Sequence, residues 1–257
     1  LSKYLIWSPI LLFRGQNIWP LMKRFSQTQF CSQEHIEGEQ FSAFKKVLEF
    51  AYTSIPFYRM KYQAAGVSTA DIRTIGDVEK IPLLTKQEIM ENLVSQNYNY
   101  LGRKFKRSTS GSTGKPLIFY KDSESMTYMD AIMYRNYSWY GIDVGDRQAR
   151  FWGHPLTRTG SLKTHAVDSL LNRIRLSAFN LHETSYRLYL RKIEQFKAQY
   201  VYGYAQSIFQ FSNYFHEKHI DLSYLKIKAV ILTGEMVFSY QIEVIKQVFG
   251  CPVTQEY

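Results

Sequence analysis

The second half of the chain alternates short apolar segments with longer amphipathic ones, and this alternation limits the possible folds. The segments that we expect to form short buried strands are residues 149–153, 200–202, 229–232 and 253–257. The helices that we expect among them are residues 184–198, 205–219 and 239–249. Strands that alternate with helices of this length favour parallel βαβ units. The sequence therefore predicts an α/β fold with layered parallel or mixed sheets flanked by helices.

The first part of the chain is expected to be mainly helical. Ser32 is a suitable N-cap for a helix over residues 33–53, which Pro56 ends. Its expected inner face consists of Phe41, Phe44, Val47, Leu48 and Ala51. Thr85 and Glu88 have the spacing of a capping box, which predicts a short helix to about residue 93.

A further helix is predicted to begin at Asp122 or Ser123 and to end near Tyr140. The residues expected to face inward from it are Met129, Ile132, Met133 and Tyr137.

Length and composition indicate a folded protein. The 257 residues are 45% hydrophobic and 16% aromatic, so a sizeable core is possible and disorder over most of the length is excluded. Repeats and linker-like stretches are absent from the sequence, and no internal domain boundary is predicted. Cys31 and Cys251 lie far apart without metal-ligand spacing, which favours a reducing, cytoplasmic location.

The positive charge is concentrated in one third of the chain. The net charge is +10, and residues 101–200 carry 17 basic against 8 acidic side chains. Such a field attracts ATP and the phosphates of CoA, and it would equally attract nucleic acid. Because helix-turn-helix, zinc-finger and RNP-like signatures are missing from the sequence, no nucleic-acid partner is expected. A solvated basic face is the alternative interpretation.

The N-terminal apolar stretch, residues 4–13, contains Pro9 and is shorter than the roughly 20 residues needed to span a bilayer. It also lacks the small-residue cleavage site of a signal peptide. Aromatic residues beside basic ones would suit contact with a membrane surface; they are Trp7, Phe13, Trp19, Arg14, Lys23 and Arg24. A helix that packs on the domain is the alternative.

A hydroxyl- and glycine-rich segment lies between two expected strands. It reads Thr109-Ser110-Gly111-Ser112-Thr113-Gly114-Lys115-Pro116. Its glycines allow backbone N–H groups to converge on an anion, its hydroxyls add donors, and Lys115 adds a mobile charge. A Walker A loop is excluded, because Thr109 replaces the first glycine and Pro116 follows the lysine. The choice at this point is between a phosphate-binding loop and an ordinary hairpin loop.

The segment resembles the phosphate-binding motif of the adenylate-forming, or acyl-CoA synthetase, superfamily, S-G-[ST]-T-G-x-P, at every fixed position from Ser110 to Pro116. Five further segments resemble landmarks of its phenylacetate-CoA ligase and CapK-like branch, in the right order. They are SIPFYR at residues 54–59, DVEKIPLLTKQEIMEN at 77–92, YGYAQS at 202–207, ILTGE at 231–235, and FGCPV at 249–253 with Tyr257.

The resemblance implies the large N-terminal domain of such an enzyme, without the C-terminal domain, since the chain ends inside the adenine motif "YG.tE". It implies an AMP-forming ligase that activates a carboxylic acid, with an aryl acid as one candidate, as an acyl-adenylate. The acyl group then passes to a thiol such as that of CoA, with Mg²⁺ assisting at ATP, and CapK-like relatives suggest polysaccharide or exopolymer modification. A truncated nucleotide-binding remnant without catalysis is the alternative.

The resemblance also assigns roles to single residues. Ser110, Ser112, Thr113 and Lys115 would hold the phosphates, with Thr109, Gly111 and Gly114 completing the loop, and Lys115 and Thr113 acting in catalysis. Gly234, Glu235 and Tyr257 would lie at the adenine, and Tyr202, Gly203, Tyr204 and Ser207 would border the acyl pocket.

The predicted strands add candidates of their own. In open α/β sheets ligands sit beyond the carboxyl ends of strands. Trp152 and His154 end one strand, as Gly234 and Glu235 end another, and Phe151 with Trp152 could wall the pocket or pack in the core. His216 and His219 lack a third ligand in register and are expected to be surface residues, so no metal site is predicted in the protein itself.

Overall fold

The computed structural model describes residues 3–92, 103–109, 116–153, 158–179 and 181–256. It divides the chain into two compact units, one made of Leu1–Phe13 and Ile132–Tyr257 and the other of Arg14–Ala131. The boundary at residue 131 falls inside helix α6 (Ser123–Ser138). We describe the two units separately.

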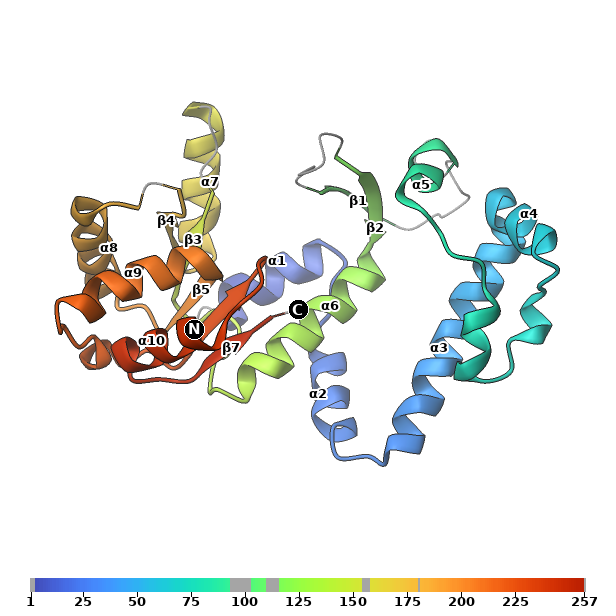
Figure 1. Ribbon diagram of the computed structural model, residues 1–257, viewed down its shortest axis with the longest axis horizontal. Helices are drawn as coiled ribbons and strands as arrows, with labels where there is room; N and C mark the ends of the chain where they lie inside the picture. The colour runs from blue at the N-terminus through green and yellow to red at the C-terminus, as the bar shows by residue number, and fades with distance from the viewer. Residues whose placement is uncertain (1–2, 93–102, 110–115, 154–157, 180, 257) are drawn as a thin grey trace. The chain divides into compact units, whose positions relative to one another are not determined.

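The first unit is built on a five-stranded sheet in which every neighbouring pair is parallel. The spatial order is β4 (Arg173–Ser177), β3 (Gln148–Trp152), β5 (Tyr200–Tyr204), β6 (Val230–Thr233) and β7 (Val253–Gln255). The helices between the strands are α7 (Arg158–Leu170), α8 (Glu183–Phe196), α9 (Ala205–Glu217) and α10 (Ser239–Phe249), with the short helix η4 (Ser223–Leu225) before β6. This confirms the predicted α/β class with a parallel sheet and flanking helices (Figure 1).

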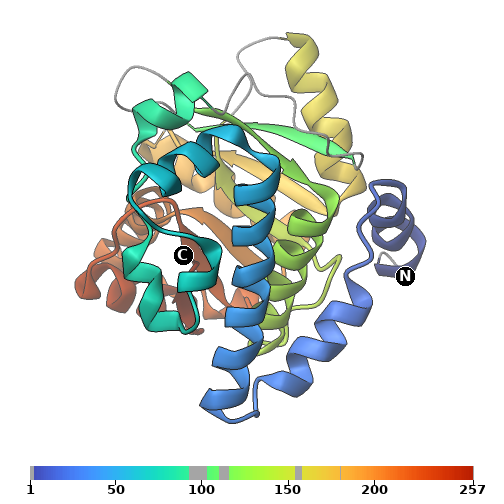
Figure 2. The ribbon, with the colours of Figure 1, turned by 90° about the vertical axis from the view of Figure 1, so that its right-hand side faces the viewer.

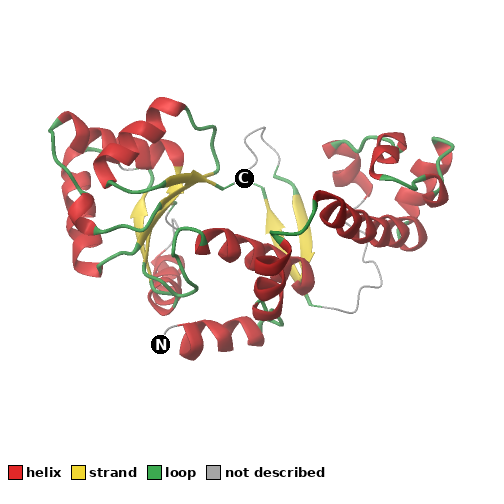
Figure 3. Cartoon of the chain, turned by 90° about the horizontal axis from the view of Figure 1, so that it is seen from below, coloured by secondary structure: helices red, strands yellow, loops and turns green. Residues whose placement is uncertain are grey.

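One face of this sheet forms the core of the unit. Phe151, Leu176, Val201, Val230 and Leu232 are all fully buried, and on β3, β4 and β5 they alternate with more polar neighbours. They pack in one cluster with apolar residues of α8, α9 and α10, which lie together on that side of the sheet (Figure 3). Because side chains alternate across a strand, the same pattern places the polar neighbours on the opposite face.

That opposite face carries aromatic and charged side chains. Tyr200 on β5 contacts the ring of Tyr137 from α6, at 6.1 Å between centroids, and its hydroxyl accepts a hydrogen bond from Gln148 at 2.9 Å. Near the N-terminus, η1 (Lys3–Trp7) and α1 (Ser8–Phe13) join the unit. Lys3 pairs with Asp143 at 2.8 Å, and Trp7 packs edge-on against Tyr134.

The second unit contains α2 (Trp19–Thr28), α3 (Gln33–Ser54), α4 (Pro56–Ala64) and α5 (Lys86–Asn92), with the short helices η2 (Thr69–Asp71) and η3 (Ile75–Lys80). The long helix α3 packs against α4 and η2 around Leu48, Tyr62 and Ile72 (Figure 2). An antiparallel hairpin of β1 (Lys104–Ser108) and β2 (Ile118–Asp122) follows, with Ser108 opposite Ile118.

Several predicted helix features are confirmed. Ser32 caps α3 by accepting a hydrogen bond from the backbone N–H of His35, and Pro56 occupies the first turn of α4. The predicted 239–249 helix matches α10, and α6 is capped by Asp122, whose Oδ1 accepts from the N–H of Ser125 at 2.6 Å. His216 and His219 are exposed, as expected.

Other expectations were wrong in detail. Val47 is 66% exposed, because the buried face of α3 centres on Leu48 and Ala51. Met129 and Ile132 are also about two-fifths exposed, and the buried side of α6 instead presents Met126, Ala131, Tyr134 and Tyr137. Strand β4 and helix α7 were not predicted at all.

The start of α5 gives a pH-dependent prediction. Thr85 donates to Glu88 through its N–H at 2.8 Å and its hydroxyl at 3.0 Å, and Lys61 donates to the other carboxylate oxygen at 2.5 Å. The Lys61 hydrogen bond and those from Thr85 lower the pKa of Glu88 from 4.5 to about 2. A lowered folded-state pKa stabilises the fold above the unfolded-state pKa, and this contribution is lost as the pH falls from about 4.5 to about 2.

We therefore expect Glu88→Gln to lower the urea midpoint of the helical circular-dichroism signal at pH 7, and to flatten its fall between pH 4.5 and 2. Thr85→Ala, which removes one donor, should flatten that fall only in part. An acid transition in Glu88→Gln with the wild-type steepness would contradict the assignment.

Candidate functional site

An aromatic surface marks the carboxyl edge of the sheet in the first unit. Trp152 ends β3 and Tyr204 ends β5, and their rings are stacked with centroids 4.4 Å apart and an interplanar angle of 11°. Phe179, which follows β4, lies 6.4 Å from the ring of Tyr204 and is 76% exposed. We call Trp152, Tyr204 and Phe179 the aromatic wall. It lies where an α/β sheet receives its ligand.

Gly234 brings the backbone after β6 against this wall. Its φ is +77°, and a Cβ at this position would lie 3.0 Å from a ring carbon of Tyr204. A side chain here would have to displace the ring in addition to adopting a left-handed conformation. Glycine at 234 therefore permits close approach of backbone to the aromatic wall.

Glu235 connects the loop after β6 to α9 and β7 by hydrogen bonds at the same edge. One carboxylate oxygen accepts a hydrogen bond from the N–H of Gln206, in the first turn of α9, at 2.8 Å. The backbone oxygen of Glu235 accepts from the side chain of Gln255, at the end of β7, at 3.2 Å. A carboxylate at a helix N-terminus satisfies a free backbone donor and complements the helix dipole. These bonds fix the loop of Gly234 and Glu235 beside β5 and β7.

Three of the residues predicted to border the acyl pocket are buried or lie within the sheet. Phe151 is fully buried on the core face, where it packs against Tyr189 and Phe211, so it supports Trp152 from behind and does not line the edge. The hydroxyl of Ser207 is buried and donates to the backbone oxygen of Ala178 at 3.0 Å. Gly203 lies on β5 against the backbone of Phe151.

Tyr202 belongs to a hydroxyl–carboxylate network on the polar face. The Tyr137 hydroxyl donates to Glu256 at 3.0 Å, and Tyr202 hydrogen-bonds to Thr233 and Glu256. Burial, with the Glu256 charge, raises the pKa of Tyr202 to about 12, and the same causes raise the pKa of Tyr137 well above its usual range. Both hydroxyls therefore keep their protons at neutral pH and act as donors.

The predicted phosphate loop starts from the hairpin of the second unit. The N–H of Thr109 donates to the oxygen of Leu117 at 3.0 Å, and the Leu117 N–H donates to the Thr109 hydroxyl at 2.9 Å. These two bonds close the base of the loop. The predicted loop residues Ser110, Gly111, Ser112, Thr113, Gly114 and Lys115 lie outside the described residues, as do His154 and Tyr257.

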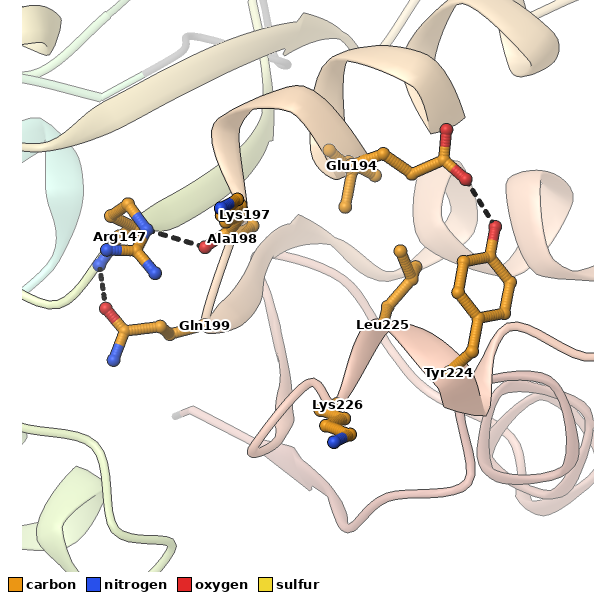
Figure 4. A pocket seen from close by; sticks show the side chains of 9 residues that line it. Arg147, Glu194, Lys197, Ala198, Gln199, Tyr224, Leu225 and Lys226 are labelled. Carbon is orange, nitrogen blue, oxygen red and sulfur yellow. Dashed lines mark hydrogen bonds between the residues drawn. The ribbon is translucent and has the colours of Figure 1, made fainter.

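A pocket of about 410 Å³ lies elsewhere on the first unit, at the amino ends of β3 and β5. Figure 4 shows Arg147 at one end of it, donating to the backbone oxygen of Lys197 at 2.6 Å, and Tyr224 donating to Glu194 at the other. The aromatic wall is at the opposite ends of these strands. This pocket is therefore separate from the candidate site.

Within the described ranges, no three His, Cys, Asp or Glu side chains gather in a way that could hold a metal ion. Within the same ranges, no helix has the length and apolar character required to cross a bilayer.

Solved structures support the fold. The chain is similar to 2-hydroxyisobutyryl-CoA ligase in an open conformation with 2-HIB-AMP and CoA, at a TM-score of 0.65 and 16% identity over 87% of this chain and 53% of that one. A second structure of that ligase, in the thioesterification state, gives a TM-score of 0.66 and 18% identity over 87% and 49%. At this identity the likeness concerns the fold alone.

Curated relatives match in sequence. Protein CapK of Staphylococcus aureus is 24% identical over 189 residues, which are 72% of this chain and 41% of CapK. The phenylacetate-coenzyme A ligase of Escherichia coli strain K12 is 29% identical over 136 residues, 52% of this chain and 31% of the ligase. These matches support the predicted resemblance to the adenylate-forming superfamily, in its phenylacetate-CoA ligase and CapK-like branch. The chain spans about a third to two-fifths of the length of these relatives, and no protein-family model matches it.

The similarity to this branch agrees with the order of elements in the first unit. The motif residues Gly234 and Glu235 follow β6, and the segment of residues 202–207 runs from the end of β5 into α9. Sequence reasoning did not identify Arg150, Arg175, Asp168 and Glu256, which also contribute to the polar face. The alternation of basic and apolar residues in RIRLS, at residues 173–177, was the available signal for β4 and two of its arginines.

Proposed function

We propose that this chain supplies the ATP-binding and acid-binding part of an AMP-forming ligase. The proposal rests on one arrangement, in which the aromatic wall and the Gly234–Glu235 loop lie at the same carboxyl edge of a parallel sheet. A flat apolar surface beside exposed backbone suits a planar or apolar ligand body with polar groups that require orientation. Similarity to phenylacetate-CoA ligases supports the reaction class.

The proposed reaction has two steps. A carboxylate oxygen of the acid attacks the α-phosphorus of ATP, forming acyl-adenylate as the bond to pyrophosphate breaks. A thiol, proposed to be that of CoA, then attacks the acyl carbon, and AMP leaves. A carboxylic acid is already ionised near neutral pH, so the first step requires no general base. Catalysis then consists of positioning the reactants and neutralising charge.

The residues divide between these tasks. The backbone and hydroxyls of residues 109–114, with Lys115, would hold the β- and γ-phosphates, and Mg²⁺ would arrive with ATP, held largely by phosphate oxygens. Gly234, Glu235 and Tyr257 would lie at the adenine. Trp152, His154, Tyr202 and Tyr204 would border the acid, with Gly203 allowing the strand to pass close to it. CapK-like relatives suggest that the acyl product serves polysaccharide or exopolymer modification.

The assignment of Lys115 is tested by ATP–pyrophosphate exchange over a panel of aryl, fatty and amino acids. Lys115→Ala should reduce exchange by roughly 10- to 100-fold, the effect of losing a hydrogen bond from a charged group worth about 1.5–3 kcal/mol. Binding of a fluorescent ATP analogue should weaken in parallel.

Lys106→Ala is the matched control, since Lys106 is an exposed lysine on β1 of the same hairpin. It removes the same charge from the hairpin without touching the loop. Equal losses of exchange activity in both variants would show that the effect comes from the overall positive charge of the hairpin. Unchanged exchange in Lys115→Ala would refute the assignment. ATP binding without exchange for any acid would favour a nucleotide-binding protein over a ligase.

A further inference from the structure

Three arginines lie close together on the polar face of the sheet. Arg150 on β3 is in register with Arg175 on β4, and Arg173 lies two residues before Arg175 on the same face. Neighbouring guanidinium groups repel one another, so such a cluster requires counter-charges. The question is which of the three are neutralised by the protein itself.

Asp168 neutralises two of them. This carboxylate of α7 is 3% exposed and accepts from Nε of Arg173 and from Nε of Arg175, both at 2.9 Å. Arg175 also donates to the backbone oxygen of Gly153 at 2.8 Å. Asp168 therefore forms its hydrogen-bonded ion pairs with Arg173 and Arg175, and it acts on Arg150 only as a nearby charge.

Arg150 has no such partner. Its Nε is buried without a hydrogen-bond partner among the described residues, and no described carboxylate forms an ion pair with it. Its guanidinium carbon lies 4.3 Å from the ring centroid of Trp152 and 5.1 Å from that of Tyr202. Burial lowers the pKa of Arg150, and the charges of Arg173 and Arg175 lower it further, while Tyr202 and the nearby charge of Asp168 partly oppose the shift.

A half-buried charge without a counter-ion is costly to a folded protein, and stacking on aromatic rings offsets only part of that cost. The residues outside the described ranges contain no Asp or Glu, so none of their side chains can supply the missing carboxylate. An anion from outside the unit fits this position best, because a planar guanidinium can bind a carboxylate or phosphate through paired hydrogen bonds.

Arg150 also lies next to the candidate site. It stacks on Trp152, and Trp152 stacks on Tyr204 at the carboxyl edge of the sheet. A ligand body on the aromatic wall could thus reach Arg150 with one end while its other end remains at the edge.

We infer that Arg150 binds a second anionic group of the acid substrate, so that the preferred acid carries a carboxylate or phosphate in addition to the carboxylate that is activated. This inference rests on the proposed function for the location of the acid. It narrows the substrate class from carboxylic acids in general to dianionic ones with an apolar or aromatic body.

Isothermal titration calorimetry without ATP tests the inference, with phenylacetate and 4-carboxyphenylacetate as matched mono- and dianionic probes. The wild-type chain should bind the dianion roughly 10- to 100-fold more tightly than the monoanion. Arg150→Gln should remove this preference. Arg150→Lys, which keeps the charge but not the fork of donors, should retain part of it.

Arg147→Gln is the control, because Arg147 is close to Arg150 in the sequence but lies at the amino end of β3, in the separate pocket. It should keep the full dianion preference. The inference is overturned if the wild-type chain binds the dianion no more tightly than the monoanion, or if Arg150→Gln and Arg150→Lys, both folded by circular dichroism, keep the wild-type preference. Because the titration uses no nucleotide, it tests the role of Arg150 even if the ATP–pyrophosphate exchange assay shows no activity.

Discussion

Asp168→Asn is expected to destabilise the first unit by about 3–5 kcal/mol, the cost of removing one member of a buried ion pair. The substitution keeps the shape of the side chain but removes its charge. Arg173 and Arg175, whose side chains are 17% and 13% exposed, would then remain beside Arg150 without a carboxylate. Three adjacent guanidinium groups would repel one another in a partly buried position. Urea unfolding followed by tryptophan fluorescence measures the change.

The control for this prediction is an exposed ion pair of the same unit. Glu243 pairs with Lys246 on α10 at 3.1 Å, with side chains 61% and 46% exposed. Glu243→Gln should cost less than about 1 kcal/mol, because solvent screens such a pair. An Asp168→Asn protein as stable as Glu243→Gln would show that Asp168 is not the counter-charge for the arginine cluster.

Gly203→Ala should be similarly damaging, for a steric reason. A Cβ at Gly203 would lie 2.3 Å from the backbone oxygen of Phe151 and 2.8 Å from its Cβ. Both strands are buried, so neither backbone can move without disturbing the core. We expect a loss of roughly 2–5 kcal/mol, combining overpacking with backbone strain at φ +155°. Urea unfolding with circular dichroism measures it.

Gly141→Ala separates the two contributions. Gly141 also has a positive φ, +71°, but a Cβ there would meet nothing within 4 Å. Its substitution should cost only about 1–2 kcal/mol of conformational strain. Equal losses at Gly203 and Gly141 would contradict the claim that close contact between β5 and β3 requires glycine.

The sequence predicted the elements whose apolar pattern is uninterrupted. Strands β3, β5, β6 and β7 and helices α8, α9 and α10 were all anticipated, since burial of a whole strand or helix face leaves a local signal. Strand β4 was missed because Arg173 and Arg175 make it look like surface. Their charges are neutralised by Asp168, which lies on α7, and no local sequence pattern indicates these ion pairs.

The division into units was equally hidden from the sequence. The boundary at Ala131 lies within a continuous helix, so it leaves no glycine-, proline- or serine-rich linker to detect. The exposure of Val47 on α3 has a related cause, because the neighbours that a helix meets decide which of its apolar residues are buried.

The candidate site was predicted in outline. Trp152, Gly234 and Glu235 could be placed at the carboxyl edge of the sheet because they end or directly follow predicted strands. The division of roles between Phe151 and Trp152 follows from the two-residue period of a strand, which sends neighbours to opposite faces. Arg150 could not be identified, since its importance depends on which charges surround it in three dimensions.

The discontinuous first unit also affects how the protein matures on the ribosome. Lys3 and its partner Asp143 are 140 positions apart, and the whole second unit lies between them in the sequence. At roughly 5–20 residues per second, the first helices must wait about 7–28 s before their binding surface has been translated. During that interval Leu11, which is 2% exposed in the folded unit, remains uncovered, and a nascent-chain chaperone would find its target there.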